Sequence, residues 1–143
     1  MNQCIGLLTI LAMSASSLAN AADPPPVAKD CSKVDTYQEM VACYWELASE
    51  ADAELERTYG NLMKKIPASA ARDLLSTSQE AWLIYRTNFC SFVSSAVEGG
   101  SLQPTVRNMC RLKTTKARLG EIVHQLHCQE GDITCISWSA RPQ

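Results

Sequence analysis

Apolar side chains recur every three or four residues along three successive segments, which predicts three amphipathic helices. The first segment begins with the sequence TYQE, in which Thr36 stands three residues before Glu39. This spacing is typical of a capping box at the start of a helix. Pro67 then ends the helix. Its predicted apolar stripe consists of Met40, Tyr44, Leu47, Ala51, Leu55, Tyr59, Leu62 and Ile66.

The next two segments continue the same period on either side of a glycine pair. Glycine ends helices at low cost, so Gly99 or Gly100 marks the end of the second helix, and Pro104 suits the first turn of the third. The second stripe consists of Leu74, Leu75, Ser78, Trp82, Tyr85, Phe89 and Phe92. The third, weaker in its polar middle, consists of Val106, Met109, Cys110, Lys113, Lys116, Leu119, Ile122, Val123 and Leu126. Without any period-two strand, the predicted fold is all-α: an antiparallel three-helix bundle with an irregular C-terminal tail.

The first 21 residues contain no Asp, Glu, Lys or Arg and include a short apolar run, Ile5 to Met13. This run is too short for a membrane span, and Ala19-Asn20-Ala21 fits the small-x-small pattern of a cleavage site. We therefore expect residues 1–21 to be a secretory signal peptide, although no lysine or arginine follows Met1. Residues 22–35 are then expected to form an extended leader, residues 36–126 the helical domain, and residues 127–143 a disulfide-closed tail.

The cysteine count agrees with export. Loss of Cys4 with the signal leaves an even number, which in an exported chain indicates disulfides and an oxidising compartment. The sequence has no Cys-x-x-Cys pair, which disfavours a zinc site. The six remaining cysteines are Cys31, Cys43, Cys90, Cys110, Cys128 and Cys135.

Spacing predicts three local disulfides among the many connectivities that six cysteines allow. Cys90 and Cys110 each lie ten residues from Gly100, so a reversal there brings them level on adjacent helices. Level positions can approach the separation of roughly 4.4 to 6.8 Å that a disulfide needs between Cα atoms. The pair of Cys31 and Cys43 would fix the leader to the first helix. The pair of Cys128 and Cys135 would close a short loop in the tail.

Charge is distributed unevenly, although the formal net charge of −2 identifies no partner. Residues 39–56 contain six acidic residues and no basic one, and residues 107–118 contain five basic residues and no acidic one. The simplest interpretation is two solvated helix faces that balance each other. An acidic chain with an export signal argues against a nucleic-acid partner.

The sequence lacks most signatures of catalysis and of cofactor binding, among them a Gly-rich phosphate loop, a Gly-x-Ser-x-Gly elbow and a His-Glu-x-x-His motif. His124 and His127 share a helix face, but a metal site needs a further ligand, and Glu121 is the one near candidate. Surface histidines near a helix C-terminus are the simpler interpretation. Three short helices also leave little room for a catalytic pocket, so we predict a protein that is not an enzyme and holds no metal or cofactor.

The stretch WLIYR suggests a structural pair. Trp82 and Arg86 lie four residues apart, so the guanidinium can stack on the indole, and Cys90 follows on the same face. We interpret these residues as holding the helix pair together. Trp138 in the tail is either a contact residue or a cap over the core, and the sequence does not separate these alternatives.

Five segments, YQEMVAC, ADAELERTYGNLM, QEAWLIYRTNFC, EGGSLQP and CRLKTTKAR, resemble the bacterial LprI-like lysozyme-inhibitor family in order and spacing. The resemblance covers about Cys31 to Ile122. It rests on Cys31, Cys43, Trp82, Arg86, Cys90, Gly99, Gly100, Cys110, Thr115 and Arg118 taken together. It implies a small, exported, disulfide-linked helical domain, and the family's founding member, a surface lipoprotein, is described as a lysozyme inhibitor.

Two features depart from that family. No lipoprotein cysteine begins the expected mature chain, which favours a soluble periplasmic or secreted form. The loop between Cys128 and Cys135 extends beyond the resemblance.

The function that the resemblance implies is binding and blocking a cell-wall hydrolase such as lysozyme, which cuts sugars between two carboxylates in a cleft. A rigid loop with a nearby cation can plug such a cleft, and a disulfide beside the loop would lower the cost of binding. The acidic first helix is a rival surface, because basic lysozymes would be steered toward it. The candidate residues are Glu98, Gly99, Gly100, Ser101, Leu102 and Gln103, called the corner below, together with Arg107.

The alternative is an interaction protein with a different partner, either an immunity protein against another wall-degrading toxin or a structural envelope protein. The target, the binding face and the oligomeric state stay open at the level of sequence.

Overall fold

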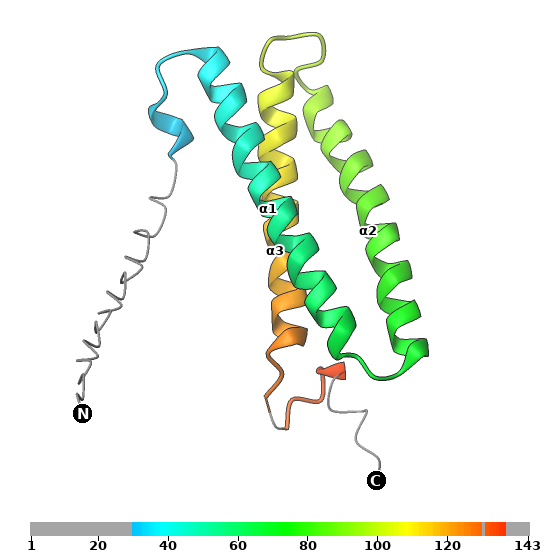
Figure 1. Cartoon of the computed structure of the whole chain (residues 1–143). Coiled ribbons are helices and arrows are strands. Elements are labelled where there is room, and N and C mark those ends of the chain that lie inside the picture. The colour runs from blue at the N-terminus through cyan, green and yellow to red at the C-terminus, as the bar shows by residue number, and fades with distance from the viewer. Residues whose placement is uncertain (1–29, 130, 137–143) are drawn as a thin grey trace, which may run out of the picture.

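The computed structural model describes residues 30–129 and 131–136, and within them the chain is helical without any strand (Figure 1). A short 3-10 helix, η1, is followed by three long helices. Their bounds are η1 Cys31–Lys33, α1 Tyr37–Lys65, α2 Ser69–Ser95 and α3 Gln103–Leu126. The predicted all-α fold class is confirmed. The expected signal peptide, most of the leader, and Trp138 lie outside the described residues.

The third helix is the centre of the molecule. α3 packs most extensively against α1 and less against α2, whereas α1 and α2 make few direct contacts. Figure 1 shows α1 and α3 running in the same direction. α2, which lies between them in the sequence, runs in the opposite direction. The bundle is therefore antiparallel at α2 and parallel along its largest interface, that of α1 with α3.

The apolar core lies toward the end of the bundle where α1 turns into α2. Leu55, Leu62 and Ile66 of the α1 segment cluster with Ile122 of α3, and Trp82 of α2 packs against this cluster. Toward the other end, the buried positions are small or polar and include Ala48, Ala51, Ser94, Thr105 and Thr115. Small side chains let the backbones approach closely but bury little apolar area, so that half of the bundle depends on other interactions.

The predicted stripes are confirmed for α1 but only in part for the other two helices. All eight α1 positions are buried or half-buried. On α2, Leu75 and Trp82 pack inward, but Leu74, Tyr85 and Phe92 are exposed. On α3, Met109, Lys113, Lys116 and Val123 are exposed. Because α2 packs mainly against α3, its contact face is narrower than the stripe that its period predicts.

The helix ends follow local rules with one difference. Pro104 lies in the first turn of α3, as predicted. α2, however, ends at Ser95, and residues 96–102 form turns, so the prediction that Gly99 or Gly100 directly follows the helix is wrong. Gly99 instead adopts a left-handed φ of +72° inside the turn.

Thr36 caps α1 through the predicted capping box. Its side chain accepts a hydrogen bond from the Glu39 backbone N–H at 3.2 Å, and the Thr36 N–H donates to Glu39 Oε2 at 2.9 Å. The Thr36 hydroxyl also donates to this carboxylate, and these bonds hold the pKa of Glu39 below its ordinary value of 4.5. The part of the cap that depends on the Glu39 carboxylate is thus present above pH 4.5 and is lost as the pH falls through the lowered pKa, whereas the bond from the Glu39 N–H to the Thr36 hydroxyl does not titrate.

We expect Thr36→Ala to lower the free energy of unfolding by about 1 kcal/mol at neutral pH, because the cap hydrogen bond is lost. The difference from the wild-type chain should shrink as the solution is acidified below pH 4.5, since Glu39 then becomes protonated in both proteins. Urea unfolding at a series of pH values measures both effects. Thr87→Ala is the matched control for a lost surface hydroxyl, because this exposed hydroxyl donates to the Leu83 carbonyl oxygen, which does not titrate. A difference between wild type and Thr36→Ala that stays constant across this pH range would contradict the account.

Candidate functional site

The corner is a tight, exposed turn at one end of the molecule. The Gly100 N–H donates to Val97 O at 3.0 Å, and the Gln103 N–H donates to Gly100 O at 3.1 Å. The Gln103 side chain accepts from the Gly99 N–H at 3.2 Å. Residues 98–102 are all exposed, so these bonds fix the backbone while the surface stays open.

Both glycines suit this geometry. Gly99 has a positive φ that other residues adopt only with strain. A Cβ at Gly100 would lie 3.1 Å from Val97 O, closer than side chains normally approach a carbonyl oxygen. The corner is therefore both compact and specified by sequence.

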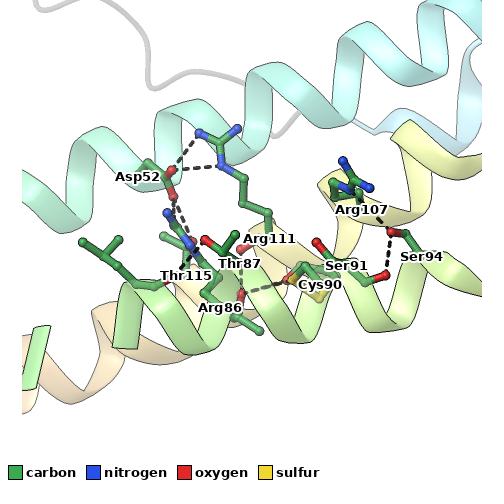
Figure 2. The surroundings of a disulfide bond; sticks show 12 residues. Asp52, Arg86, Thr87, Cys90, Ser91, Ser94, Arg107, Arg111 and Thr115 are labelled. Carbon is green, nitrogen blue, oxygen red and sulfur yellow. Dashed lines mark hydrogen bonds and ion pairs between the residues drawn. A yellow bond between two sulfur atoms is a disulfide. The ribbon is translucent and has the colours of Figure 1, made fainter. Parts of the chain in front are cut away.

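A disulfide joins the two helices just below the corner. Cys90 and Cys110 are bonded, with their Cα atoms 5.5 Å apart, as their equal spacing from Gly100 predicts (Figure 2). The other two predicted pairs are also present in the structure. Cys31–Cys43 ties η1 to α1, with a Cα separation of 5.7 Å, and Cys128–Cys135 closes the tail loop at 5.6 Å.

Arg107 follows the corner by one helical turn on α3. Its Nε donates a long hydrogen bond of 3.4 Å to Ser94 Oγ on α2. Ser94 is fully buried, and its hydroxyl donates to Ser91 O. Arg107 is thus tethered to α2 through one nitrogen (Figure 2), while the residue remains exposed. Its position four residues after Gln103 on α3 places a cation near the corner.

Asp52 forms a hub that joins all three helices. Its Oδ1 accepts from Arg86 at 2.6 Å and from the Thr115 hydroxyl at 2.9 Å. Its Oδ2 accepts from Arg111 Nε at 2.9 Å and from Arg111 NH2 at 2.7 Å. Figure 2 shows the two guanidinium groups converging on this one carboxylate. The network is partly buried, with the Arg86 side chain 15% exposed and that of Asp52 24%.

The hub revises the interpretation of two charged runs as solvated faces. Asp52 belongs to the acidic run and Arg111 to the basic run, and the two pair across the interface of α1 with α3. Arg86 also lies over the Trp82 ring, with its guanidinium carbon 4.7 Å from the ring centroid, so the predicted stacking is present. No local pattern in the sequence indicates which of the six acidic residues forms the hub.

An apolar hollow of about 570 Å³ lies beside the corner, between α1 and the start of α3. Trp45, which is 58% exposed, forms one wall, and Pro104 and Asn108 form the other. Leu102 of the corner is also largely exposed. This end of the molecule therefore presents apolar groups together with the cation of Arg107.

One histidine has potential metal ligands close by among residues 30–129 and 131–136. His124 approaches Asp132 and Cys135, but Cys135 is bonded to Cys128 and offers no thiolate, so this described group retains two potential ligands, His124 and Asp132. His124 Nε2 lies 3.2 Å from Asp132 Oδ2, and hydrogen bonds from Thr134 are the main cause of a lowered pKa for Asp132. These contacts hold the tail loop against the end of α3.

No helix in residues 30–129 and 131–136 is long and apolar enough to cross a membrane.

Comparison with known proteins gives one family. A family model described as lysozyme inhibitor LprI matches residues 28–122. A protein of Rhizobium meliloti (strain 1021), described only as uncharacterized, is 26% identical over 132 residues, which cover 84% of this chain and 93% of the relative. No solved structure matches.

Proposed function

The chain belongs to the lysozyme inhibitor LprI family, and from this premise we propose that it is an exported protein that binds and inhibits a peptidoglycan hydrolase of the lysozyme type. The periplasm or the medium is its proposed location, in keeping with three disulfides that need an oxidising compartment.

The observation that carries the proposed binding site is the rigid, exposed corner. A glycosidase cleft is a concave site with two carboxylates on its floor. A protruding turn without bulky side chains at Gly99 and Gly100 can enter such a cleft, and Arg107 is close enough to pair with a carboxylate. Glu98 adds one negative charge to the corner. We therefore expect the side that carries Arg107 to face the carboxylates on the cleft floor.

The corner is held in place before it binds. Its backbone hydrogen bonds and the disulfide of Cys90 with Cys110 restrict the turn in the free protein. A loop that is already ordered loses less conformational entropy on association, so more of the contact energy appears as affinity.

The surroundings of the corner supply the area that a stable complex needs. A specific interface buries roughly 800 Å² on each partner, which a six-residue turn alone cannot provide. Trp45 and the hollow beside it extend the corner toward α1. Tryptophan is among the residues that most often dominate binding energy, so we expect Trp45 to lie within the interface.

The rival surface is the exposed acidic face of α1, represented by Glu50 and Glu54. It would attract a basic lysozyme at long range. Asp52 is engaged in the hub, however, and this face lies on a regular helix rather than on a protruding turn. We therefore propose that it contributes to the rate of encounter rather than to the contact itself.

The experiment is a lysis assay with the purified, disulfide-bonded chain from residue 22 onward. We expect it to slow lysozyme's lysis of bacterial cells in a dose-dependent manner. Lysis should be about tenfold or more slower once the concentration of the chain is about ten times its Kd for lysozyme. The reduced and alkylated protein is the control and should lose most of the effect. Unchanged lysis at large molar excess, with lysozymes of several types, would refute lysozyme inhibition and favour an immunity or structural protein with another envelope partner.

A further inference from the structure

An open apolar groove of about 850 Å³ runs between α2 and α3, and Tyr44 of α1 also lines it. Its walls include Tyr85, Phe89 and Val93 of α2 and Met109, Lys113 and Lys116 of α3. None of these residues belongs to the corner or to the Asp52 hub. The groove is therefore a surface that the proposed inhibition of a hydrolase does not use.

A row of aromatic side chains along this groove is exposed to solvent. Tyr85 and Phe89 stack with ring centroids 5.4 Å apart, and Phe92 follows at 6.5 Å from Phe89. Tyr85 is 53% exposed, and Phe92, which does not line the groove but contacts the lining residue Phe89, is 73% exposed. Burying apolar side chains is favourable in proportion to the area removed from water, so a continuous exposed row of them is typical of a surface that a partner covers.

The shape of the groove fits a helix. The α3 residues that line it run from Val106 to Ala117, a span of about 16 Å at 1.5 Å per residue, or three helical turns. Parallel walls formed by two helices accept the apolar face of a third helix, as in other helix-in-groove complexes. Aromatic and methionine side chains such as Phe89 and Met109 are also the types enriched at protein interfaces.

Charge defines the partner further. Lys113 and Lys116 are the two charged residues among those that line the groove, and no carboxylate lines it. Both lysines are exposed, and neither forms an ion pair with any residue in the described parts of the chain. An acidic group on the occupant would therefore gain attraction here without displacing an existing pair.

We propose that the groove between α2 and α3 binds an amphipathic helix of another protein, one whose apolar stripe of about three turns is flanked by acidic residues. The aromatic row of Tyr85, Phe89 and Phe92 receives the stripe, and Lys113 with Lys116 pairs with the acidic flank.

Two synthetic helical peptides of about 14 residues test the proposal. They share one leucine stripe and differ only in the residues that flank it, which are glutamates in one peptide and lysines in the other. With the disulfide-bonded chain, we expect the glutamate peptide to bind at least about tenfold more tightly by fluorescence anisotropy. The double change Lys113→Glu with Lys116→Glu should reverse this preference. The matched control, Lys64→Glu with Lys65→Glu at the end of α1, should leave it unchanged.

Phe92→Glu, at a position too exposed to affect folding, should weaken both peptides. Equal binding of the two peptides, or a preference that survives the change at Lys113 and Lys116, would overturn the proposal. A third outcome would also overturn the proposal: the wild-type chain self-associates and Phe92→Glu abolishes this self-association. The occupant of the groove would then be a second copy of the chain. Leu102→Asp in the corner should leave peptide binding intact, which keeps this test separate from that of hydrolase inhibition.

Discussion

Asp52→Ala is expected to lower the free energy of unfolding by about 2–4 kcal/mol, because it leaves Arg86 and Arg111 without their shared carboxylate. Removing one partner of a fully buried ion pair costs about 3–5 kcal/mol, and the partial exposure of Asp52 reduces that figure. Urea unfolding monitored by circular dichroism measures the loss.

The control for this substitution is Glu54→Ala, an exposed carboxylate two residues along the same helix. We expect it to change stability by less than about 0.5 kcal/mol. A loss at Asp52 no larger than that at Glu54 would show that the hub does not hold the three helices together.

Removal of the disulfide below the corner is expected to have the second large effect. Cys90→Ser with Cys110→Ser opens a cross-link that spans 20 residues, which should lower the free energy of unfolding by about 3 kcal/mol. Inhibition of the hydrolase should also weaken under conditions where the variant remains folded, because the corner loses its covalent support. Unfolding curves and the lysis assay on the same preparation separate the two effects.

Cys128→Ser with Cys135→Ser is the matched control. This pair lies in the tail loop, at the opposite end of the molecule from the corner (Figure 1). Its shorter separation of 7 residues predicts a smaller loss, about 2 kcal/mol, with inhibition retained. Equal loss of inhibition in the two double variants would mean that the first acts through general stability rather than through the corner.

Local signals in the sequence were sufficient for much of the fold. The spacing of Thr36 and Glu39 predicted the start of α1, since a capping box depends only on neighbouring residues. The equal distances of Cys90 and Cys110 from Gly100 predicted a disulfide, since a reversal between two helices sets the register by counting residues.

Contacts between residues far apart in the sequence could not be predicted in this way. The Asp52 hub joins residues 34, 59 and 63 positions apart, and helical periodicity does not specify which carboxylate meets which guanidinium. The period of α2 predicted an apolar stripe that includes Tyr85 and Phe92, but periodicity does not say whether a partner helix covers each position. Whether Tyr85 and Phe92 are covered depends on how closely α2 packs against α1, and this packing is a property of the tertiary structure.

The two ends of the bundle are stabilised differently. At one end, Leu62, Ile66 and Ile122 form a core by burial. Nearer the corner, the buried side chains are small, and the disulfide of Cys90 with Cys110 and the Asp52 hub connect the helices instead. This arrangement keeps the corner rigid without a large apolar core beneath it, and leaves apolar groups such as Trp45 available at the surface.

The most direct test of the central claim compares the corner with the acidic face of α1 as the surface that binds lysozyme. One variant carries Leu102→Asp with Arg107→Ala, and the other carries Glu50→Lys with Glu54→Lys. The measurement is the Kd for lysozyme at physiological salt, with unfolding curves to verify that both variants are folded. We predict that the corner variant raises Kd by about 30-fold or more, as loss of central contacts does, and that the acidic-face variant mainly slows association. An unchanged Kd for the corner variant, with binding lost in the acidic-face variant, would contradict the account.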